Sequence, residues 1–264
     1  MDVFMDGIQQ QREHFETQAE QYLKARESPR HIYLKNEMWR ALLSDDLVAS
    51  LPQDRPIRML EPMCGACDGR MIIEDQLGYQ VDYAGFDYSP AMVATARGRF
   101  PEANIWEQDV TKFEADAQFD LIMLVGALHH VAEHAESVVA KLSASLAPGG
   151  IFVLSEPVHN NPVFRLVREA IYKRNDSFDF ETERGFTTAE LREIFTSAGM
   201  ETVKEIYPSM LAYVLWGCPE AFPALDKGPM PLVRSYVALE RLFWGSLPAK
   251  YLTFGMFSAY RKPL

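Results

Sequence analysis

Three acidic residues mark the ends of apolar segments in the first half of the chain. Glu61 and Asp87 each end such a segment, and Asp109 follows a third one. Because parallel strands present their carboxyl ends at one edge of a sheet, we expect these carboxylates to face a common ligand. An acid at the place of Asp87 normally accepts hydrogen bonds from both hydroxyls of a ribose. Charge-assisted bonds of this type are strong, and Asp109 could accept one from an exocyclic amine.

The turn after Glu61 has Met63, Gly65 and Cys67 at alternate positions. Gly65 lets the backbone approach a ligand closely. A dinucleotide site would need G-x-G-x-x-G here. The carboxylates of Glu61 and Asp68 would also repel a pyrophosphate at the start of the following helix. We therefore predict a cationic or hydroxyl-bearing ligand rather than a nicotinamide or flavin dinucleotide.

The pair Cys64-x-x-Cys67 has the spacing of a redox pair or of half a zinc site. Cys218 is the only other cysteine in the chain, and no histidine or cysteine follows at ligand spacing. We predict that the pair consists of small residues that fill a tight turn, and that the protein has no metal site.

Three histidines follow apolar segments at the same predicted edge. His129 and His130 come after residues 119–125, and His159 comes after residues 151–156. A histidine there could act as a general base for an acceptor hydroxyl or amine, or it could be a structural residue bonded to the backbone. All three are catalytic candidates. Gly126, just past the earlier segment, would let a flat ring pass close to the backbone.

Apolar segments alternate with helical ones over about 100 residues, which is typical of βαβ units on a parallel sheet. The expected strands are 57–61, 81–87, 104–107, 119–125 and 151–156, and the expected helices are 69–77, 90–99 and 135–146. Thr187 and Glu190 match a capping box that opens a helix ending near Gly199. Further strands are expected at 201–207 and 252–260.

The two ends of the chain differ from this pattern. Residues 8–50 predict two helices broken around Ser28-Pro29, and we assign residues 1–50 to an N-terminal helical lid. Residues 51–264 are predicted to form one α/β domain with a helical insertion at about 208–248, before the last strand. Many aromatic residues lie between 206 and 257. They suit either a cap over a hydrophobic acceptor or a homodimer interface, and the sequence leaves both open.

Composition limits the partners. The 264 residues carry a net charge of −11, which argues against a broad nucleic-acid surface. The longest apolar stretch, residues 121–128, is far shorter than the ~20 residues of a membrane-spanning helix. The N-terminus carries acids where a secretory signal would carry cations. We expect a cytoplasmic protein that acts on a small molecule, with no nucleic-acid or membrane partner.

Five ordered segments resemble the class I S-adenosylmethionine-dependent methyltransferases. They are the turn after Glu61, GFDYSPAMVATAR (85–97), EQDV (107–110), FDLIMLVGALHHV (119–131) and LAPGGIFVLSEP (146–157). The resemblance covers roughly residues 55–260. It implies a Rossmann-like sheet of seven strands, mostly parallel, with an antiparallel last strand. The family usually has glycine where this chain has Met63 and Cys67.

The resemblance also implies that S-adenosylmethionine is the cofactor, and it assigns residues to its parts. The cofactor-binding candidates are Glu61 and Gly65 at the methionyl part, Asp87 at the ribose, Tyr88, Met92 and Val110 beside the adenine, Asp109 at its amino group, and Tyr22 in a helix that closes over the site. For Tyr22, an ordinary amphipathic helix packed on the body is an equal alternative.

The implied function is transfer of a methyl group to an oxygen, nitrogen, carbon or sulfur atom of a small molecule. Two alternatives stay open. One keeps the cofactor and attacks its aminocarboxypropyl carbon, either to transfer that group or to close a ring, and releases methylthioadenosine. The other is a non-catalytic, cofactor-binding regulatory subunit. The three strand-end carboxylates count against the second, because a site that binds nothing has no physical need for them.

Overall fold

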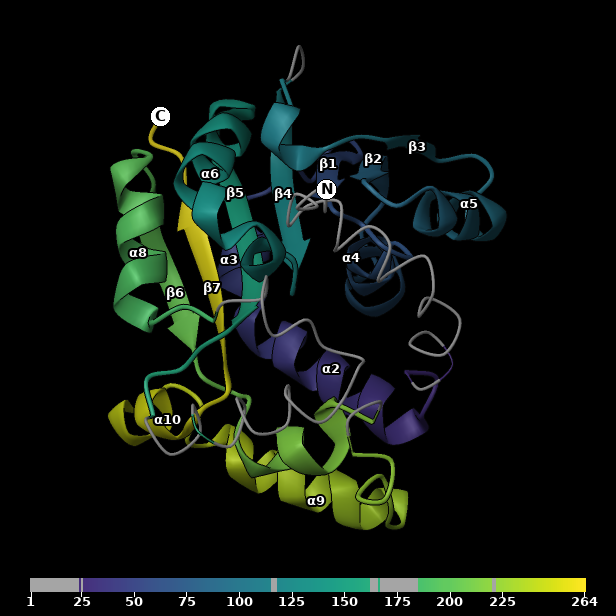
Figure 1. Cartoon of the computed structure of the whole chain (residues 1–264), viewed down its shortest axis with the longest axis vertical. Coiled ribbons are helices and arrows are strands. Elements are labelled where there is room, and N and C mark those ends of the chain that lie inside the picture. Colours follow the sequence, from purple (N-terminus) through teal and green to yellow (C-terminus); the bar gives the residue numbers. More distant parts are fainter. Residues whose placement is uncertain (1–23, 25, 115–117, 162–165, 167–184, 220–221) are drawn as a thin grey trace, which may run out of the picture.

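A seven-stranded sheet organises the computed structural model, which describes residues 24, 26–114, 118–161, 166, 185–219 and 222–264 (Figure 1). The strands are β1 (Ile57–Pro62), β2 (Val81–Asp87), β3 (Asn104–Glu107), β4 (Phe119–Val125), β5 (Leu146–Pro157), β6 (Glu201–Ile206) and β7 (Gly255–Arg261). Their order is β3-β2-β1-β4-β5-β7-β6. β7 runs antiparallel to both of its neighbours, whereas the pairs among β1 to β5 are parallel. The predicted fold class is confirmed.

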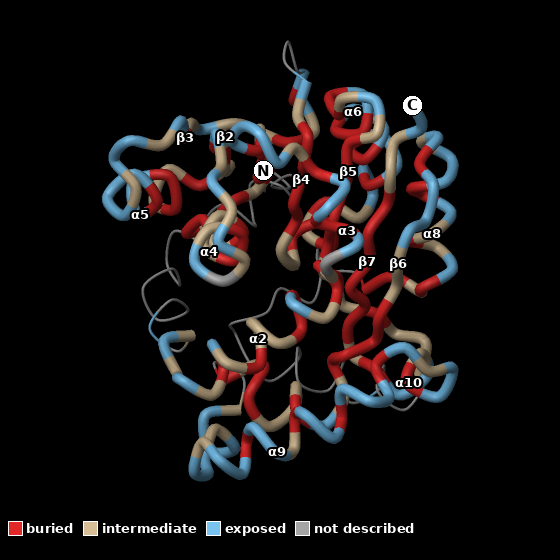
Figure 2. Tube along the Cα trace, turned by 180° about the vertical axis from the view of Figure 1, so that it is seen from behind, coloured by how far each residue is buried: buried red, intermediate tan, exposed pale blue. Residues whose placement is uncertain are grey.

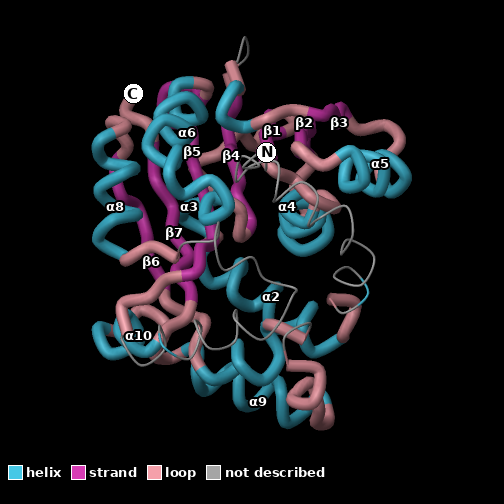
Figure 3. Tube along the Cα trace, in the orientation of Figure 1, coloured by secondary structure: helices cyan, strands magenta, loops and turns pink. Residues whose placement is uncertain are grey.

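Helices cover both faces of the sheet (Figure 3). They are α2 (Pro29–Leu42), α3 (Asp45–Val48), α4 (Asp68–Met71), α5 (Pro90–Arg99), α6 (Ala135–Ala144), α8 (Thr188–Ser197), α9 (Met230–Arg241) and α10 (Leu247–Leu252). Short turns of other helix types join them: η1 (Ile72–Gln76), η2 (Val110–Lys112), η3 (Leu128–His134) and η4 (Tyr213–Gly217). Among the described helices, none is long and apolar enough to cross a membrane.

The central strand β4 shows how the two cores arise. Leu121 and Met123 belong to one hydrophobic cluster, and Ile122 and Leu124 belong to the other. Successive side chains of a strand point to opposite faces, so a continuous apolar run indicates a strand covered on both sides. Helices α2, α5 and α9 contribute to the first cluster, and α6 and α8 to the second. The buried trace runs through the middle of the molecule (Figure 2).

Local signals placed several elements correctly. Ser89 caps α5 by accepting from the Met92 N–H at 3.3 Å, with proline at the first helical position. Thr187 Oγ1 accepts from the Glu190 N–H at 3.1 Å, and the Glu190 carboxylate accepts from the Thr187 N–H at 3.3 Å. The capping box is therefore confirmed.

Two predicted boundaries are wrong. Leu252 ends helix α10 and does not begin a strand; β7 starts at Gly255. Residues 252–260 are mostly apolar, so hydrophobicity alone does not show where α10 ends and β7 begins. Ser246 caps the start of α10, and a proline lies in its first turn. β5 begins at Leu146, five residues before the predicted start, because Leu146 already pairs with Phe119.

Candidate functional site

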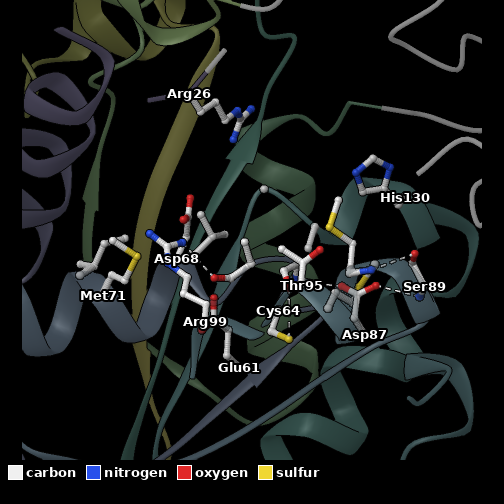
Figure 4. Close-up of a pocket in the computed structure, with 18 of the residues that line it drawn as sticks. Arg26, Glu61, Cys64, Asp68, Met71, Asp87, Ser89, Thr95, Arg99 and His130 are labelled. Carbon is white, nitrogen blue, oxygen red and sulfur yellow. Dashed lines mark hydrogen bonds between the residues drawn. The ribbon is translucent and has the colours of Figure 1, made fainter. Parts of the chain in front are cut away.

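A cavity of about 480 Å³ lies at the carboxyl ends of β1, β2 and β4 (Figure 4). Most of the predicted site residues line it: Glu61, Gly65, Asp87, Tyr88, Met92, Asp109, Val110, Gly126 and His130. These residues come from positions up to 69 apart in the chain, and the parallel strands bring them together as the strand-end argument predicts. Tyr22 lies outside the described residues.

Glu61 organises the first wall of the cavity from inside the protein. Its carboxylate accepts from the Gly69 N–H at 2.7 Å, the Arg70 N–H at 3.1 Å and the Tyr83 hydroxyl at 2.8 Å. A Cβ at position 69 would lie 2.8 Å from the Glu61 carboxyl carbon, so only glycine fits there. Burial raises the pKa of Glu61 to about 8, although these donors favour the ionised form. Glu61 therefore holds the turn as well as lining the cavity.

The turn between Glu61 and Gly69 adopts left-handed backbone at three alternate positions. The φ angles are 52° at Met63, 51° at Gly65 and 63° at Cys67. L-residues rarely take this conformation, and glycine takes it without cost. Met63 and Cys67, where the family usually has glycine, thus retain the backbone conformation that glycine favours. Cys64 and Cys67 are buried in the turn, and the Cys67 N–H donates to the Cys64 carbonyl at 2.8 Å.

Asp87 ties this turn to the end of β2. One carboxylate oxygen accepts from the Gly65 N–H at 2.8 Å, and the other accepts from the Ser89 N–H at 2.9 Å. Burial raises the pKa of Asp87, and the backbone donors oppose that shift. A carboxylate has about four acceptor positions. Asp87 therefore retains capacity for further donors from the cavity.

Asp109 caps the short helix η2 on the far side of the cavity. It accepts from the Thr111 N–H at 2.9 Å and the Thr111 hydroxyl at 2.8 Å, and it pairs with Lys112 at 3.1 Å. Although burial works against it, these bonds hold the pKa of Asp109 below its ordinary value. Asp109 is therefore an ionised acceptor at neutral pH.

A second buried carboxylate, which the sequence reasoning missed, holds the turn after β4. Glu156 accepts from the N–H groups of residues 127, 128 and 129 at 2.9, 2.7 and 3.2 Å, and its Oε2 lies 2.9 Å from His129 Nδ1. Burial raises the pKa of Glu156 to about 7. Its position near the end of a strand is the same signal that drew attention to Glu61.

The three candidate histidines separate in the structure. His130 lines the cavity. His129 is buried against Glu156 and is not among the residues of the cavity wall; its ring is tilted by 36° against that of His130, with centroids 4.0 Å apart. His159 also lies outside the wall, where its backbone N–H donates to the Phe186 carbonyl at 2.9 Å. Of the three, His130 is placed to meet a molecule in the cavity, and the ring of His129 has a contact typical of a structural residue.

The cavity also has a basic corner that local sequence patterns do not predict. Lys35, from α2, pairs with Asp68 at 2.8 Å, and Arg26 and Arg99 line the cavity nearby (Figure 4). Lys35 lies in α2 and Arg26 shortly before it, whereas Arg99 ends α5, so the tertiary packing of both helices brings these residues to the site. In contrast, none of the described residues between 206 and 257 lines the cavity. The described aromatic residues of this stretch, for which the sequence leaves a cap or a dimer interface open, are therefore not part of this cavity wall.

Comparisons with known proteins agree with this geometry. Residues 59–150 match the model of a methyltransferase domain. Over 139 residues the chain is 30% identical to a trans-aconitate 2-methyltransferase of Variovorax paradoxus, an alignment that covers 52% of this chain and 53% of that protein. The chain thus spans about half the length of the curated relatives it matches.

Solved structures share the fold at low identity. One is from a complex between the Haloferax volcanii Trm112 methyltransferase activator and a methyltransferase, with 20% identity, a TM-score of 0.62, and coverage of 96% and 97% of the two chains. Another is the [4+2]-cyclase SpnF, with 20% identity, a TM-score of 0.54, and coverage of 83% and 79%.

The sheet order, the strand-end acids and the matched domain define a cofactor-binding Rossmann-like protein. Residues 59–150 match a methyltransferase domain, and the fold is that of the class I S-adenosylmethionine-dependent methyltransferases, to which the chain is similar. The cavity suits the cofactor of this family, because Asp87 and Asp109 have acceptor capacity for hydroxyl and amine donors. The acidic groups also favour the positively charged sulfonium of this cofactor, and the cofactor has no phosphate group that they would repel.

Proposed function

We propose that this chain transfers the methyl group of S-adenosylmethionine to a small-molecule acceptor. The observation that carries the proposal is that Asp87, Asp109 and His130, from three separate strand ends, line one cavity. The matched methyltransferase domain supports it. His130 follows the turn after β4. The same cavity therefore contains the acids proposed to bind the cofactor and a side chain that can accept a proton.

Each wall of the cavity has a proposed task in holding the cofactor. Asp87 would accept from the ribose hydroxyls with the positions that Gly65 and Ser89 leave open. Asp109 would accept from the exocyclic amine. Apolar side chains would enclose the adenine ring, namely those of Tyr88, Met92 and Val110. Gly65 would meet the methionyl part through its backbone, and Glu61 would act mainly by fixing that turn.

When bound, S-adenosylmethionine supplies a methyl group that its sulfonium already makes electrophilic. The protein then has to align the acceptor, exclude water and remove a proton where the nucleophile carries one. Alignment contributes about 7–11 kcal/mol in well-oriented reactions, and a positioned base adds about 10²–10⁴-fold. We propose His130 as that base, because it lines the cavity and a neutral imidazole nitrogen can accept a proton.

Replacing Asp87 tests the cofactor site directly. We expect Asp87→Ala to bind S-adenosylmethionine at least about a hundredfold more weakly, because two charge-assisted bonds are lost. Calorimetric titration with S-adenosylmethionine and S-adenosylhomocysteine measures this. The matched control is Asp82→Ala, an exposed acid on the same strand. Equal affinity of Asp87→Ala and the wild type would overturn the site assignment.

The spent mixture identifies the chemistry. Mass spectrometry should find S-adenosylhomocysteine; methylthioadenosine would indicate attack at the aminocarboxypropyl carbon instead, and cofactor binding without turnover in a cell extract would favour a regulatory subunit. Trans-aconitate is the first acceptor to test, because the relatives are named for it. A product from another small molecule would leave the proposed reaction intact and change only the acceptor.

A further inference from the structure

Two titratable groups lie behind His130, the candidate base in the cavity wall. The ring of His129 is tilted by 36° against the His130 ring, with the centroids 4.0 Å apart. His129 Nδ1 in turn lies 2.9 Å from Oε2 of Glu156, near the end of β5. The three side chains thus form a row from the protein interior to the cavity, where His130 lies on the side of Asp87 and Ser89 (Figure 4). A general base is often oriented by a third group in this way.

Glu156 fixes the backbone that carries His130. Its carboxylate accepts from the N–H groups of residues 127–129, and the His130 N–H donates to the Ala127 carbonyl at 3.1 Å. Helical geometry is then interrupted at Val131, where φ is −125° and ψ is 35°. The direction of the His130 side chain therefore depends on a turn that one buried carboxylate holds.

Few groups can offset the charge of Glu156 when it is ionised. Its side chain has no exposed surface, and an ionised carboxylate is costly to bury unless it is paired and hydrogen-bonded. Within the described part of the chain, its only ion-pair partner is His129, and β7 places the uncharged Met256 opposite it in the sheet. Apart from the backbone N–H groups of the turn, the two histidines are therefore the groups that can stabilise the ionised form.

Burial decides which of the two histidines takes a proton. His129 is 8% exposed, whereas His130 is half-buried and faces the cavity. Burial disfavours a charged ring, and an ionised carboxylate only accepts hydrogen bonds, so a neutral His129 donates its Nδ1–H to Glu156. The positive charge then forms on His130. Burial raises the pKa of Glu156 to about 7, and its electrostatic interaction with His130 opposes that shift.

We propose that Glu156 is a positioning residue for the reaction, which orients His130 through the turn and strengthens the binding of a proton to its ring. As the acceptor atom bonds to the methyl carbon, the electron pair of the C–S bond stays on sulfur and the acceptor proton moves to a ring nitrogen of His130. The role of His130 in that step rests on the proposed function. The effect of Glu156 on the proton affinity of the ring does not.

Other titratable groups lie on the elements around His130, namely Asp87 and Asp109 in the cavity wall and the exposed Glu133, His134 and Glu136 on η3 and α6. All of them remain in a variant that changes only Glu156. The difference between Glu156→Gln and the wild type therefore isolates the buried carboxylate, and glutamine keeps an acceptor oxygen for the turn.

Proton NMR of the full chain without ligand tests the inference independently of activity. The ring signals of His130, assigned by their loss in His130→Gln, are followed over pH. We expect Glu156→Gln to bind the His130 proton about tenfold more weakly, so that the ring titrates at lower pH. Glu240→Gln is the matched control, because Glu240 is also buried and accepts from a backbone N–H at 2.9 Å and a ring N–H at 3.3 Å, but lies outside the cavity wall. It should leave the titration unchanged.

A reciprocal measurement needs no change at Glu156, so it holds even where Glu156→Gln fails to fold. Coupling between two sites is equal in both directions. In His130→Gln, carbon NMR should therefore show that the Glu156 carboxyl binds its proton about tenfold more tightly than in the wild type. In methyl-transfer assays, Glu156→Gln should lower kcat about tenfold and shift its pH profile to lower pH, while the affinity for S-adenosylmethionine stays within about twofold.

Equal or tighter proton binding by His130 in Glu156→Gln would overturn the inference, whatever the activity of the variant. So would an unchanged Glu156 titration in His130→Gln. A shifted titration together with full activity of His130→Gln would overturn the positioning role and the assignment of the base, and would leave the cofactor site untouched. The binding of S-adenosylmethionine, measured on Asp87→Ala, tests that site separately.

Discussion

Two buried glutamates perform the same structural task on two sides of the cavity. Glu61 lies in β1 and holds the N–H groups of Gly69 and Arg70, while Glu156 lies in β5 and holds those of residues 127–129. Burial raises the pKa of both, to about 8 and about 7. In each case a carboxylate on one strand fixes a turn that lines the cavity.

The last partner of each carboxylate differs. Glu61 accepts from the Tyr83 hydroxyl, and burial raises the pKa of that phenol further above neutrality. Glu156 faces the ring of His129 at 2.9 Å, and an imidazole can donate or accept a proton. Both sides can therefore respond to pH, Glu61 near pH 8 and Glu156 near pH 7. They differ in the neighbour of the carboxylate, since only Glu156 has an imidazole beside it, next to the candidate base His130.

Removing Glu61 should have the largest effect of any change in this comparison. Glu61→Ala leaves three buried donors without their acceptor, so we expect the free energy of unfolding to fall by about 4 kcal/mol. Urea unfolding followed by circular dichroism measures this. Tyr83→Phe removes only one of the three bonds and should cost about 1 kcal/mol. A loss below 1 kcal/mol in Glu61→Ala would show that the turn does not depend on this carboxylate.

A pH series on Glu156→Gln should reveal a smaller effect. The pKa of Glu156 rises from 4.5 to about 7 in the folded protein. The proton therefore stabilises the fold below pH 4.5, and that contribution is lost as the pH rises through about 7. Relative to Glu156→Gln, the wild type should lose about 3 kcal/mol of unfolding free energy across this range.

Unfolding in urea at several pH values provides the measurement. Glu193→Gln, an exposed residue on α8, is the control and should track the wild type. The same series on Glu61→Gln should place the loss at higher pH, because its pKa is about 8. A constant difference between wild type and Glu156→Gln at all pH values would contradict the comparison.

Local patterns predicted those parts of the fold that local forces decide. The bounds of β2 and β4 coincide with the predicted segments 81–87 and 119–125, since an apolar run ended by polar or glycine residues signals a buried strand. Because parallel strands present their carboxyl ends at one edge of the sheet, the sequence also predicted that Asp87 and Asp109 lie at the same edge.

Other features depend on contacts far apart in the chain. The ion pair of Lys35 with Asp68 requires α2 to reach the turn after β1, and no pattern near either residue indicates that. Helical spacing predicts α9, but it does not tell which of its two apolar sides is buried. Glu156 carries the same strand-end signal as Glu61, yet its role appears only when the turn after β4 closes on it.

The smallest expected effect concerns the backbone of the two turns. The turn held by Glu61 places Met63 at a φ of 52° and Cys67 at 63°, whereas the turn held by Glu156 uses Gly126 at 62°. The left-handed conformation destabilises the folded state by roughly 1–2 kcal/mol when an L-residue adopts it. Glycine avoids this strain, but ordering its more flexible unfolded chain costs about 0.5–1 kcal/mol. Met63 also packs against the second hydrophobic cluster, and loss of that contact offsets the gain, so Met63→Gly should change the free energy of unfolding by less than about 0.5 kcal/mol.

The reciprocal change at the other turn sharpens this prediction. Gly126→Ala has open space for its Cβ but takes on the left-handed strain, so it should cost about 1 kcal/mol. Cys67→Gly is the control for side-chain loss, because it relieves the same strain but removes a fully buried side chain. In thermal melts, Met63→Gly should shift the midpoint by less than about 2 °C. A loss of stability in Met63→Gly as large as that in Gly126→Ala would mean that relief of strain in the β1 turn does not offset the lost packing of Met63.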